Sequence, residues 1–509
     1  MPTINRNLRL RQAFGATELI AFCTIAGLVT NTIAGSPAFN SPNYPLTIVE
    51  AVELALRQNP MILVQVEEIK RNQGLVLQAQ AALLPQVQGT GTYSQEEPSL
   101  VTYGSGSTSS NVDALIAPVN HPPGLNPSTW TTLVLTPASS QSYIGVYKRW
   151  TLQVTISQLL WDGGAALANR REAKFNEEAA YCTLRNAIDN VVDTVRIQFY
   201  QILVDRALVQ VQEEAVNLLR SELDDQQGRF DAGTATHFDV LQARTQLQNQ
   251  LPRLLAAQRN YLLAQATLAK LLGIPAGRRY SSEEPLPVSG SLDVEPFEVD
   301  LEKALAVARA RRPLLKADQR NVSAAIANRS AAKAGFQPTI SANAGLQSES
   351  KPHGNDLQDV VNGWQLGASG QWNILDGGTT YGKVKVANSQ IEEAKIALND
   401  AQRQVELDVF TAISNLHRAQ ESMIAARKGV EVSLRSFSVA YQRRTEGKGS
   451  QLDVFDARNQ LTLARSTFLR SEYQYLSAIA QYQYVTGTEA TYNDAFDQGG
   501  IHPKTLSKW

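Results

Sequence analysis

Long apolar runs, cysteine and an excess of charge of either sign are all scarce in this chain of 509 residues. The formal net charge is −1, so no basic excess indicates binding to nucleic acid and no acidic tail is indicated. Of the two cysteines, Cys23 and Cys182, only the second remains if the N-terminus is removed, which excludes an intramolecular disulfide bond. Beyond residue 34 no stretch supplies the ~20 consecutive apolar residues of a membrane-spanning helix. Any membrane role must therefore be built from something other than helices.

The N-terminus has the pattern of a secretory signal. Three arginines precede a mostly apolar run over residues 19–29, and the small-residue site Thr32-Ile33-Ala34 follows it. We predict a signal peptide over residues 1–34, with a buried helix as the alternative. A lipid-attachment site at Cys23 is disfavoured, because the bulky Phe22 precedes that cysteine.

Motifs that carry chemistry are also lacking. The five histidines have no ligand-like spacing to one another or to a cysteine, so neither a metal nor a cofactor is predicted: His121, His237, His353, His417 and His502. Residues 377–383 resemble a phosphate-binding loop, but Val384 stands where Ser or Thr should hold Mg²⁺. The corresponding segment 163–170 lacks the Gly-Lys pair, and we interpret both segments as strand-to-helix turns. No nucleophile elbow is present, and the chain is predicted not to be an enzyme.

The chain consists of two related copies. Two prolines of the first copy recur 253 residues later, and three residues further along recur 214 residues later: Pro60 and Pro313, Pro85 and Pro338, Asp162 and Asp376, Gly233 and Gly447, Asp239 and Asp453. The difference of 39 residues is an insertion in the first copy, within the Gly-, Ser-, Thr- and Pro-rich region 98–142. We place the first repeat at 46–273, a linker at 274–298, the second repeat at 299–487 and a tail at 488–509.

Each copy predicts the same series of helices. Residues 46–84 and 299–337 have helix-period apolar positions, with Pro85 and Pro338 as stops. Long helices are expected over 164–229 and 378–443, and return helices over 236–272 and 450–486, with Pro252 interrupting and kinking the first return helix. Apolar residues at coiled-coil spacing match between the long helices: Val191, Val195, Phe199 and Ile202 with Val405, Val409, Ile413 and Leu416.

Between these helices the hydrophobic period changes to two. We predict strands over residues 85–96, 143–161, 338–348 and 362–375, each with one apolar face and one polar but uncharged face. An ordinary soluble sheet would show the same alternation. Four of the six tryptophans lie in or at the ends of these strands, as an interfacial girdle requires: Trp150, Trp161, Trp364 and Trp372.

These elements predict a mixed α and β membrane protein that is completed by other copies of itself. Four strands cannot close a barrel, and open sheet edges are not tolerated in lipid. Three copies would supply a 12-stranded outer-membrane β-barrel, continued by a long periplasmic α-helical barrel. Because long loops of such barrels face outward, the insertion is expected outside the cell and every helix in the periplasm.

Residues 46–487 resemble the TolC-like outer-membrane efflux protein family. The resemblance rests on the two-copy layout, the Asp-Gly-Gly after the second and fourth strands, and the two Gly…Asp-Val…Ala-Arg turns. It implies a homotrimeric outer-membrane conduit that docks a periplasmic adaptor protein and an inner-membrane transporter and catalyses nothing. The conduit would export small molecules or proteins in a tripartite efflux or type I secretion system. The alternative is a periplasmic adaptor or coiled-coil scaffold without a pore.

The resemblance also assigns roles to residues of the helix-to-helix turns. Asp453 and Asp456 match aspartates that line the closed periplasmic entrance in the family, although Ser450 and Asp453 also form the sequence pattern of a capping box. The family's adaptor contacts map to the turns at Gly233 and Gly447. A family arginine that latches the entrance shut falls at Gly449, so the family's latch chemistry does not carry over directly.

Overall fold

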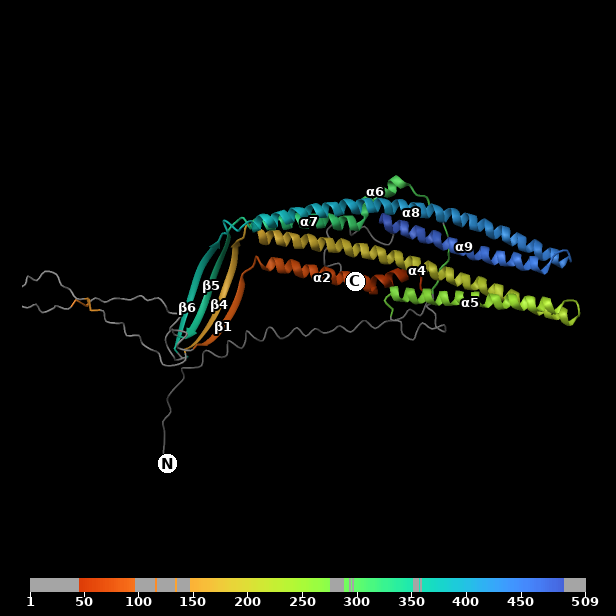
Figure 1. Ribbon diagram of the computed structural model, residues 1–509, viewed down its shortest axis with the longest axis horizontal. Coiled ribbons are helices and arrows are strands. Elements are labelled where there is room, and N and C mark those ends of the chain that lie inside the picture. Colours follow the sequence, from red (N-terminus) through yellow and green to blue (C-terminus); the bar gives the residue numbers. More distant parts are fainter. Residues whose placement is uncertain are drawn as a thin grey trace, which may run out of the picture.

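The computed structural model describes residues 45–96, 115–116, 133–134, 147–274, 288–292, 294, 297–350, 357 and 359–488. The molecule is elongated, with a four-stranded sheet at one end and a bundle of long helices running away from it (Figure 1). The predicted signal peptide 1–34, most of the insertion and the tail beyond Thr488 lie outside the described residues.

The two repeats fold in the same order of elements. The first consists of α1 (Ile48–Gln58), α2 (Pro60–Ala81), β1 (Gln86–Glu96), β4 (Tyr147–Trp161), α4 (Ala165–Asp231) and α5 (His237–Leu271). The second consists of α6 (Leu301–Arg311), α7 (Pro313–Ala334), β5 (Thr339–Ser350), β6 (Val360–Gln371), α8 (Thr379–Thr445) and α9 (Gln451–Thr486). A short hairpin, β2 (Leu115–Ile116) and β3 (Leu133–Val134), lies within the insertion.

The first helix of each repeat was predicted as one unit, and this is wrong. Each is divided by a single extended residue before a proline: Asn59 before Pro60, and Arg312 before Pro313. A residue before proline is pushed out of the helical region, while proline fits the first position of a new helix. The Asn59 side chain accepts a hydrogen bond from the amide of Met61 at 2.8 Å, which caps the second piece.

Other boundaries also differ from the prediction. The strand expected to reach residue 375 ends at Gln371, and each 67-residue long helix runs two residues further than predicted. At 1.5 Å per residue, such a helix is about 100 Å long. Pro252 lies inside α5 and does not interrupt it, which corrects the expected break. Its ring removes one backbone donor, and the remaining 35-residue helix continues on both sides.

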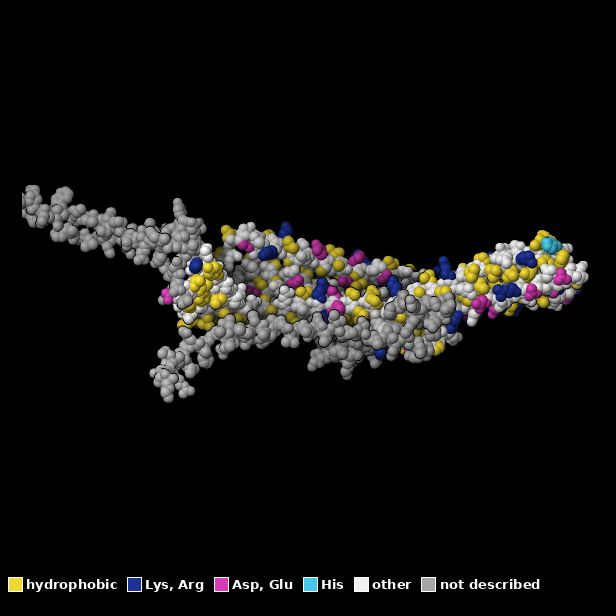
Figure 2. Space-filling model, turned by 90° about the horizontal axis from the view of Figure 1, so that it is seen from below, with side chains coloured by type: hydrophobic (Ala, Val, Ile, Leu, Met, Phe, Trp, Pro, Cys, Tyr) yellow, Lys and Arg dark blue, Asp and Glu magenta, His cyan; other side chains and the backbone are white. Residues whose placement is uncertain are grey.

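The sheet is antiparallel in the order β1-β4-β5-β6, so β1 and β6 are edge strands. Its predicted alternation is confirmed by the register, in which Val154 faces Leu346 and Leu346 faces Trp364. The apolar face is open, since Leu346, Trp364 and Leu366 are 67, 77 and 75% exposed. Figure 2 shows hydrophobic side chains gathered over this end of the molecule.

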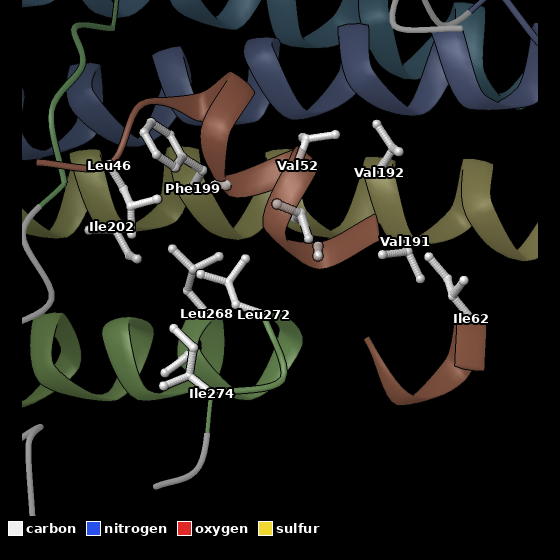
Figure 3. Packing of buried hydrophobic residues seen from close by; sticks show 14 of the residues in the cluster. Leu46, Val52, Ile62, Val191, Val192, Phe199, Ile202, Leu268, Leu272 and Ile274 are labelled. Atoms are coloured by element: carbon white, nitrogen blue, oxygen red, sulfur yellow. The ribbon is translucent and has the colours of Figure 1, made fainter. Parts of the chain in front are cut away.

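The largest hydrophobic core lies midway along the helices. Its members come from α1, α2, α4 and α5, with Leu272, Ile274 and Val288 from the segments after α5 (Figure 3). All four predicted seam residues of α4 are at most 3% exposed. In α8 their counterparts Val405, Val409 and Leu416 are equally buried, and Ile413 is partly buried. The coiled-coil seam read from the sequence is therefore confirmed as the core of both repeats.

Among the helices that the structure describes, none combines the length and the apolar character needed to cross a membrane.

Candidate functional site

The end of the bundle farthest from the sheet is formed by two helix-to-helix turns, one in each repeat (Figure 1). Gly233 and Gly447 have φ angles of 74° and 71°, in the left-handed region that L side chains rarely adopt. The Gly233 amide donates to Phe230 O at 2.9 Å and the Gly447 amide to Arg444 O at 2.9 Å, which ends each long helix. The predicted left-handed glycine turns are confirmed, and the adaptor contact assigned to them stays a prediction.

Both return helices begin with the predicted capping box. The Asp453 carboxylate accepts a hydrogen bond from the Ser450 amide at 3.1 Å, and the Asp239 carboxylate accepts one from the Thr236 amide at 2.9 Å. The hydrogen bonds from Thr236 lower the pKa of Asp239. Asp456 lies one turn further on, with an exposed side chain. Asp453 therefore starts its helix, and the lining of an entrance by either aspartate stays a prediction.

A buried ionic cluster joins the two repeats near these turns, and the sequence gave no direct sign of it. One oxygen of Glu222 on α4 accepts hydrogen bonds from Arg444 Nη1 at 3.0 Å, Gln451 Nε2 at 2.6 Å and Gln226 Nε2 at 2.9 Å. The side chains of Glu222 and Arg444 are each 14% exposed. Burial alone would raise the pKa of Glu222, but the hydrogen bond from Gln226 and the charge of Arg444 outweigh it and lower the pKa.

A second cation borders this cluster. Arg458 on α9 is 6% exposed, and its guanidinium lies 4.9 Å from the centroid of the Phe455 ring. Burial lowers the pKa of Arg458 and the charge of Glu222 opposes that effect. Phe455 packs with Val216 and Leu219 of α4, so apolar and ionic contacts both hold the start of α9 against the first repeat.

Comparison of the two copies contains the only sequence signal for the cluster. The positions of Glu222 and Arg444 correspond, 214 residues away, to Ser436 and Phe230. The ion pair therefore occurs once, and such departures between copies mark where the repeats do different things.

The predicted strand-to-helix turns are confirmed at the other end of the long helices. The Asp376 carboxylate accepts hydrogen bonds from the amides of Gly378 at 3.0 Å and Thr380 at 2.7 Å. Asp162 accepts equivalent bonds from Gly164 at 2.9 Å and Ala166 at 2.6 Å. These are the amides that a phosphate would need at a helix N-terminus, and the chain's own carboxylate already occupies them.

The four tryptophans lie at two levels of the sheet. Trp150 of β4 and Trp364 of β6 lie toward the ends away from the helices, whereas Trp161 ends β4 and Trp372 follows β6. Trp161, Trp364 and Trp372 are 48 to 77% exposed, while Trp150 is half-buried and donates from Nε1 to Leu357 O at 3.1 Å. Eight to eleven residues separate the two levels, or roughly 27 to 37 Å of strand. This spacing is compatible with the girdles of a membrane barrel.

No group of three or more His, Cys, Asp or Glu side chains that could hold a metal ion occurs within the described ranges. The functional features are thus the sheet, the two turns and the cluster beside them.

The family model for "Outer membrane efflux protein" matches residues 51–274 and 304–488. The chain belongs to the outer membrane efflux protein family. The outer membrane efflux protein BepC of Brucella suis biovar 1 (strain 1330) is 25% identical over 344 residues, which are 66% of this chain and 72% of that protein. The outer membrane protein TolC of Escherichia coli (strain K12) is 32% identical over 120 residues, 24% of each chain.

Solved structures of outer-membrane channels share the fold. The CmeC channel of Campylobacter jejuni aligns with a TM-score of 0.70 at 16% identity, covering 91% of this chain and 88% of that one. The VceC protein of Vibrio cholerae aligns with a TM-score of 0.65 at 17% identity, covering 86% and 96%. The predicted family and its location, in the outer membrane with a periplasmic helical barrel, are confirmed.

Proposed function

We propose that this protein is the passive exit duct of a tripartite efflux pump or type I secretion system, and that it is not an enzyme. It works as a homotrimer in which three four-stranded sheets close a 12-stranded β-barrel in outer-membrane lipid. The long helices continue the barrel through the periplasm as a tube that carries small molecules or proteins outward. Energy comes from an inner-membrane transporter, which a periplasmic adaptor protein connects to the duct.

The observation that carries this proposal is the open sheet with an exposed apolar face. In the described chain β1 and β6 each pair along one edge, which leaves backbone groups without a partner. Unpaired backbone groups cost several kcal/mol each in lipid, so a membrane sheet must be closed by further strands. A row of exposed apolar side chains next to a polar, uncharged face suits lipid outside and water inside.

The two turns and the entrance follow from this arrangement. The Gly233 and Gly447 turns lie at the end of the tube away from the membrane, where an adaptor protein would reach them (Figure 1). The exposed Asp456 carboxylates of three copies would gather at the mouth of the tube, where crowded like charges attract cations. Trp161, Trp364 and Trp372 would anchor the barrel at the lipid interface, together with Trp150.

Extraction and conductance measurements test the proposal. The protein should sediment with outer membranes, require detergent for extraction, run as a trimer in detergent and conduct ions in a planar lipid bilayer. An adaptor or scaffold without a pore would stay soluble and conduct nothing. A stable monomer that spans the bilayer alone would contradict the closed barrel.

Neighbouring residues of β6 provide a matched control for the orientation of the sheet. Leu366→Lys would place a charge on the lipid face, at a cost of about 2–4 kcal/mol near the middle of the bilayer. Gln365→Lys places the same charge on the opposite face, toward water. We expect the first variant to lose membrane-inserted trimer and the second to retain it. Equal loss in both variants would show that the sheet does not face lipid as proposed.

A further inference from the structure

The interface between the two repeats of one chain consists of α4 packed against α7 and α9. Glu178 of α4 pairs with Arg320 of α7 at 3.2 Å, and Arg196 of α4 donates to Gln483 of α9 at 2.9 Å. We call this interface the in-chain seam. It brings the second repeat's short helices onto the first repeat's long helix.

The duplication implies a second interface of the same kind that one chain cannot make. By the offsets of 214 and 253 residues, α8 corresponds to α4, α5 to α9 and α2 to α7. All of α2, α5 and α8 is described, and neither α2 nor α5 makes a comparable contact with α8. In Figure 1, α8 lies on one side of the bundle and α2 and α5 on the other. The two halves of the second interface are therefore both free.

Both free halves carry exposed apolar side chains. On α8 these are 56 to 66% exposed: Val386, Ile396, Leu407 and Phe410. On α2, Leu63 and Val64 are 50 and 63% exposed, although Ala317, the counterpart of Val64 in α7, is 3% exposed within the in-chain seam. A position that is buried in one copy and apolar but exposed in the other indicates a missing partner.

We propose that the first repeat of a second copy of this chain docks on α8, with its α2 and α5 placed as α7 and α9 are placed on α4. This inference rests on the proposed function, because it specifies how the copies of the duct meet. The free α8 and the free α2 and α5 lie on different faces of one chain, so each copy can engage two others. Such a head-to-tail arrangement generates a ring when the rotation closes.

The duplication also predicts individual contacts. Burial raises the pKa of the Cys182 thiol on α4, and the charge of the nearby Lys316 on α7 opposes this effect. The counterparts of Cys182 and Lys316 are Ile396 and Leu63. We therefore expect Leu63 of one copy to lie opposite Ile396 of another.

The seam between copies differs chemically from the in-chain seam. Asp193 and Arg196 of α4 correspond to Leu407 and Phe410 of α8, and Lys316 to Leu63. Ionisable groups within the chain are thus replaced by apolar groups between copies. Because burial of apolar surface depends little on salt and pH, association of the copies should be less sensitive to both than an ionic seam would be.

One in-chain contact changes in a way that charge can accommodate. The ion pair of Arg320 with Glu178 corresponds to Glu67 and Glu392, which are both acidic. Each has a lysine one turn away: Lys70 lies 2.6 Å from Glu67, and Lys395 lies 2.8 Å from Glu392. The two lysines lie near enough to face the opposing acid across the seam.

Thiol cross-linking of membrane-inserted protein tests the pairing. Leu63→Cys and Ile396→Cys are combined in full-length protein with Cys23 and Cys182 replaced by serine, and a short bismaleimide is added. We expect covalent dimers and trimers on a denaturing gel, and none with either cysteine alone. The control combines Leu63→Cys with Val432→Cys, which also lies on α8, about 54 Å from Ile396 along the helix, and should give no cross-linked species.

Co-expression distinguishes links between copies from links within one chain. Chains that carry only Leu63→Cys are co-expressed with differently tagged chains that carry only Ile396→Cys, and a cross-linked dimer with both tags is expected. If the protein is a trimer in detergent but this dimer is absent, the assigned seam is wrong and the channel proposal stands. If the protein is a monomer, the proposed trimer fails as well. Cross-linking confined to single chains would also overturn the assigned seam.

Discussion

Asp193 is an ionisable side chain buried among the groups that join the two repeats. It is 8% exposed on α4, between Asp189 and Arg196, and its Oδ1 atom has no hydrogen-bond partner. Asp189 is influenced by the charge of Arg312, and Arg196 binds Gln483, so both neighbours reach the second repeat. Burial raises the pKa of Asp193 from 3.8 to about 6, although the charge of Arg196 acts in the opposite direction.

The raised pKa fixes the sign of the pH dependence. The folded protein holds the Asp193 proton more tightly than the unfolded chain does, so this group stabilises the fold progressively as the pH falls from above 6 toward 4. A pKa displaced from 3.8 to about 6 corresponds to about 3 kcal/mol of stability lost at neutral pH, when the buried group is charged. Near pH 4 most of this cost is absent, because the group is protonated in the folded state.

Asp193→Asn tests this account because it removes the charge and keeps the shape. At about pH 7.5 the variant should be more stable than the original by up to about 3 kcal/mol, less whatever the new amide loses by being buried. Near pH 4 the difference should shrink by about 2 kcal/mol. The measurement is thermal unfolding of the detergent-purified protein, followed by far-ultraviolet circular dichroism at one scan rate across this pH range.

The control is Asp224→Asn, which removes an exposed carboxylate from the same helix. A surface substitution of this kind changes stability by little, so its melting temperature should follow the original protein at every pH. A difference between Asp193→Asn and the original that is the same at all pH values would refute the reasoning. A variant that is less stable near pH 7.5 would show instead that the charged carboxylate is compensated by Arg196.

Three further predictions concern the end of the helical tube. Replacing Gly233 and Gly447 together with bulky residues should abolish export, measured as drug resistance or secretion, while trimers stay in the membrane; unchanged export would place docking elsewhere. Asp456→Asn should weaken cation selectivity and block by divalent cations in single-channel recordings, whereas Asp453→Asn should chiefly lower helix stability by about 1 kcal/mol; block at the same cation concentration in the double variant would exclude both from the constriction. Glu222→Gln should destabilise the contact between repeats by about 2 kcal/mol, because it leaves a half-buried arginine without its counter-charge; limited proteolysis should then cut near the second turn, and an unchanged cleavage pattern would contradict this.

The sequence predicted the features that repeat or that depend on neighbouring residues. The duplication, the long helices and the two-residue period of the strands are periodic patterns, and periodicity reports which face of an element is buried. The capping boxes at Asp239 and Asp453 and the left-handed Gly233 and Gly447 are local backbone requirements that lie within a few residues. These predictions held because their causes are short-range.

The predictions that failed involved competition between local signals and packing. Helical periodicity across residues 46–84 concealed the break at Asn59, where the side chain that caps α2 also donates to Leu271 O at 2.8 Å. Pro252 looked like a break from the sequence, yet α5 continues through it along α4. In the first case proline geometry prevailed over periodicity, and in the second the packing of a long helix prevailed over one missing hydrogen bond.

The sequence by itself determined the family, the order of elements and the turns, because each is written in patterns that recur or in residues that lie close together. Only the tertiary structure decided how the two repeats join. The pair of Glu222 and Arg444 spans 222 positions of the chain, and neither residue has a charged counterpart in the other copy. Such a contact depends on which faces of α4, α8 and α9 meet, and that is settled by the burial of Phe455 against Val216 and Leu219.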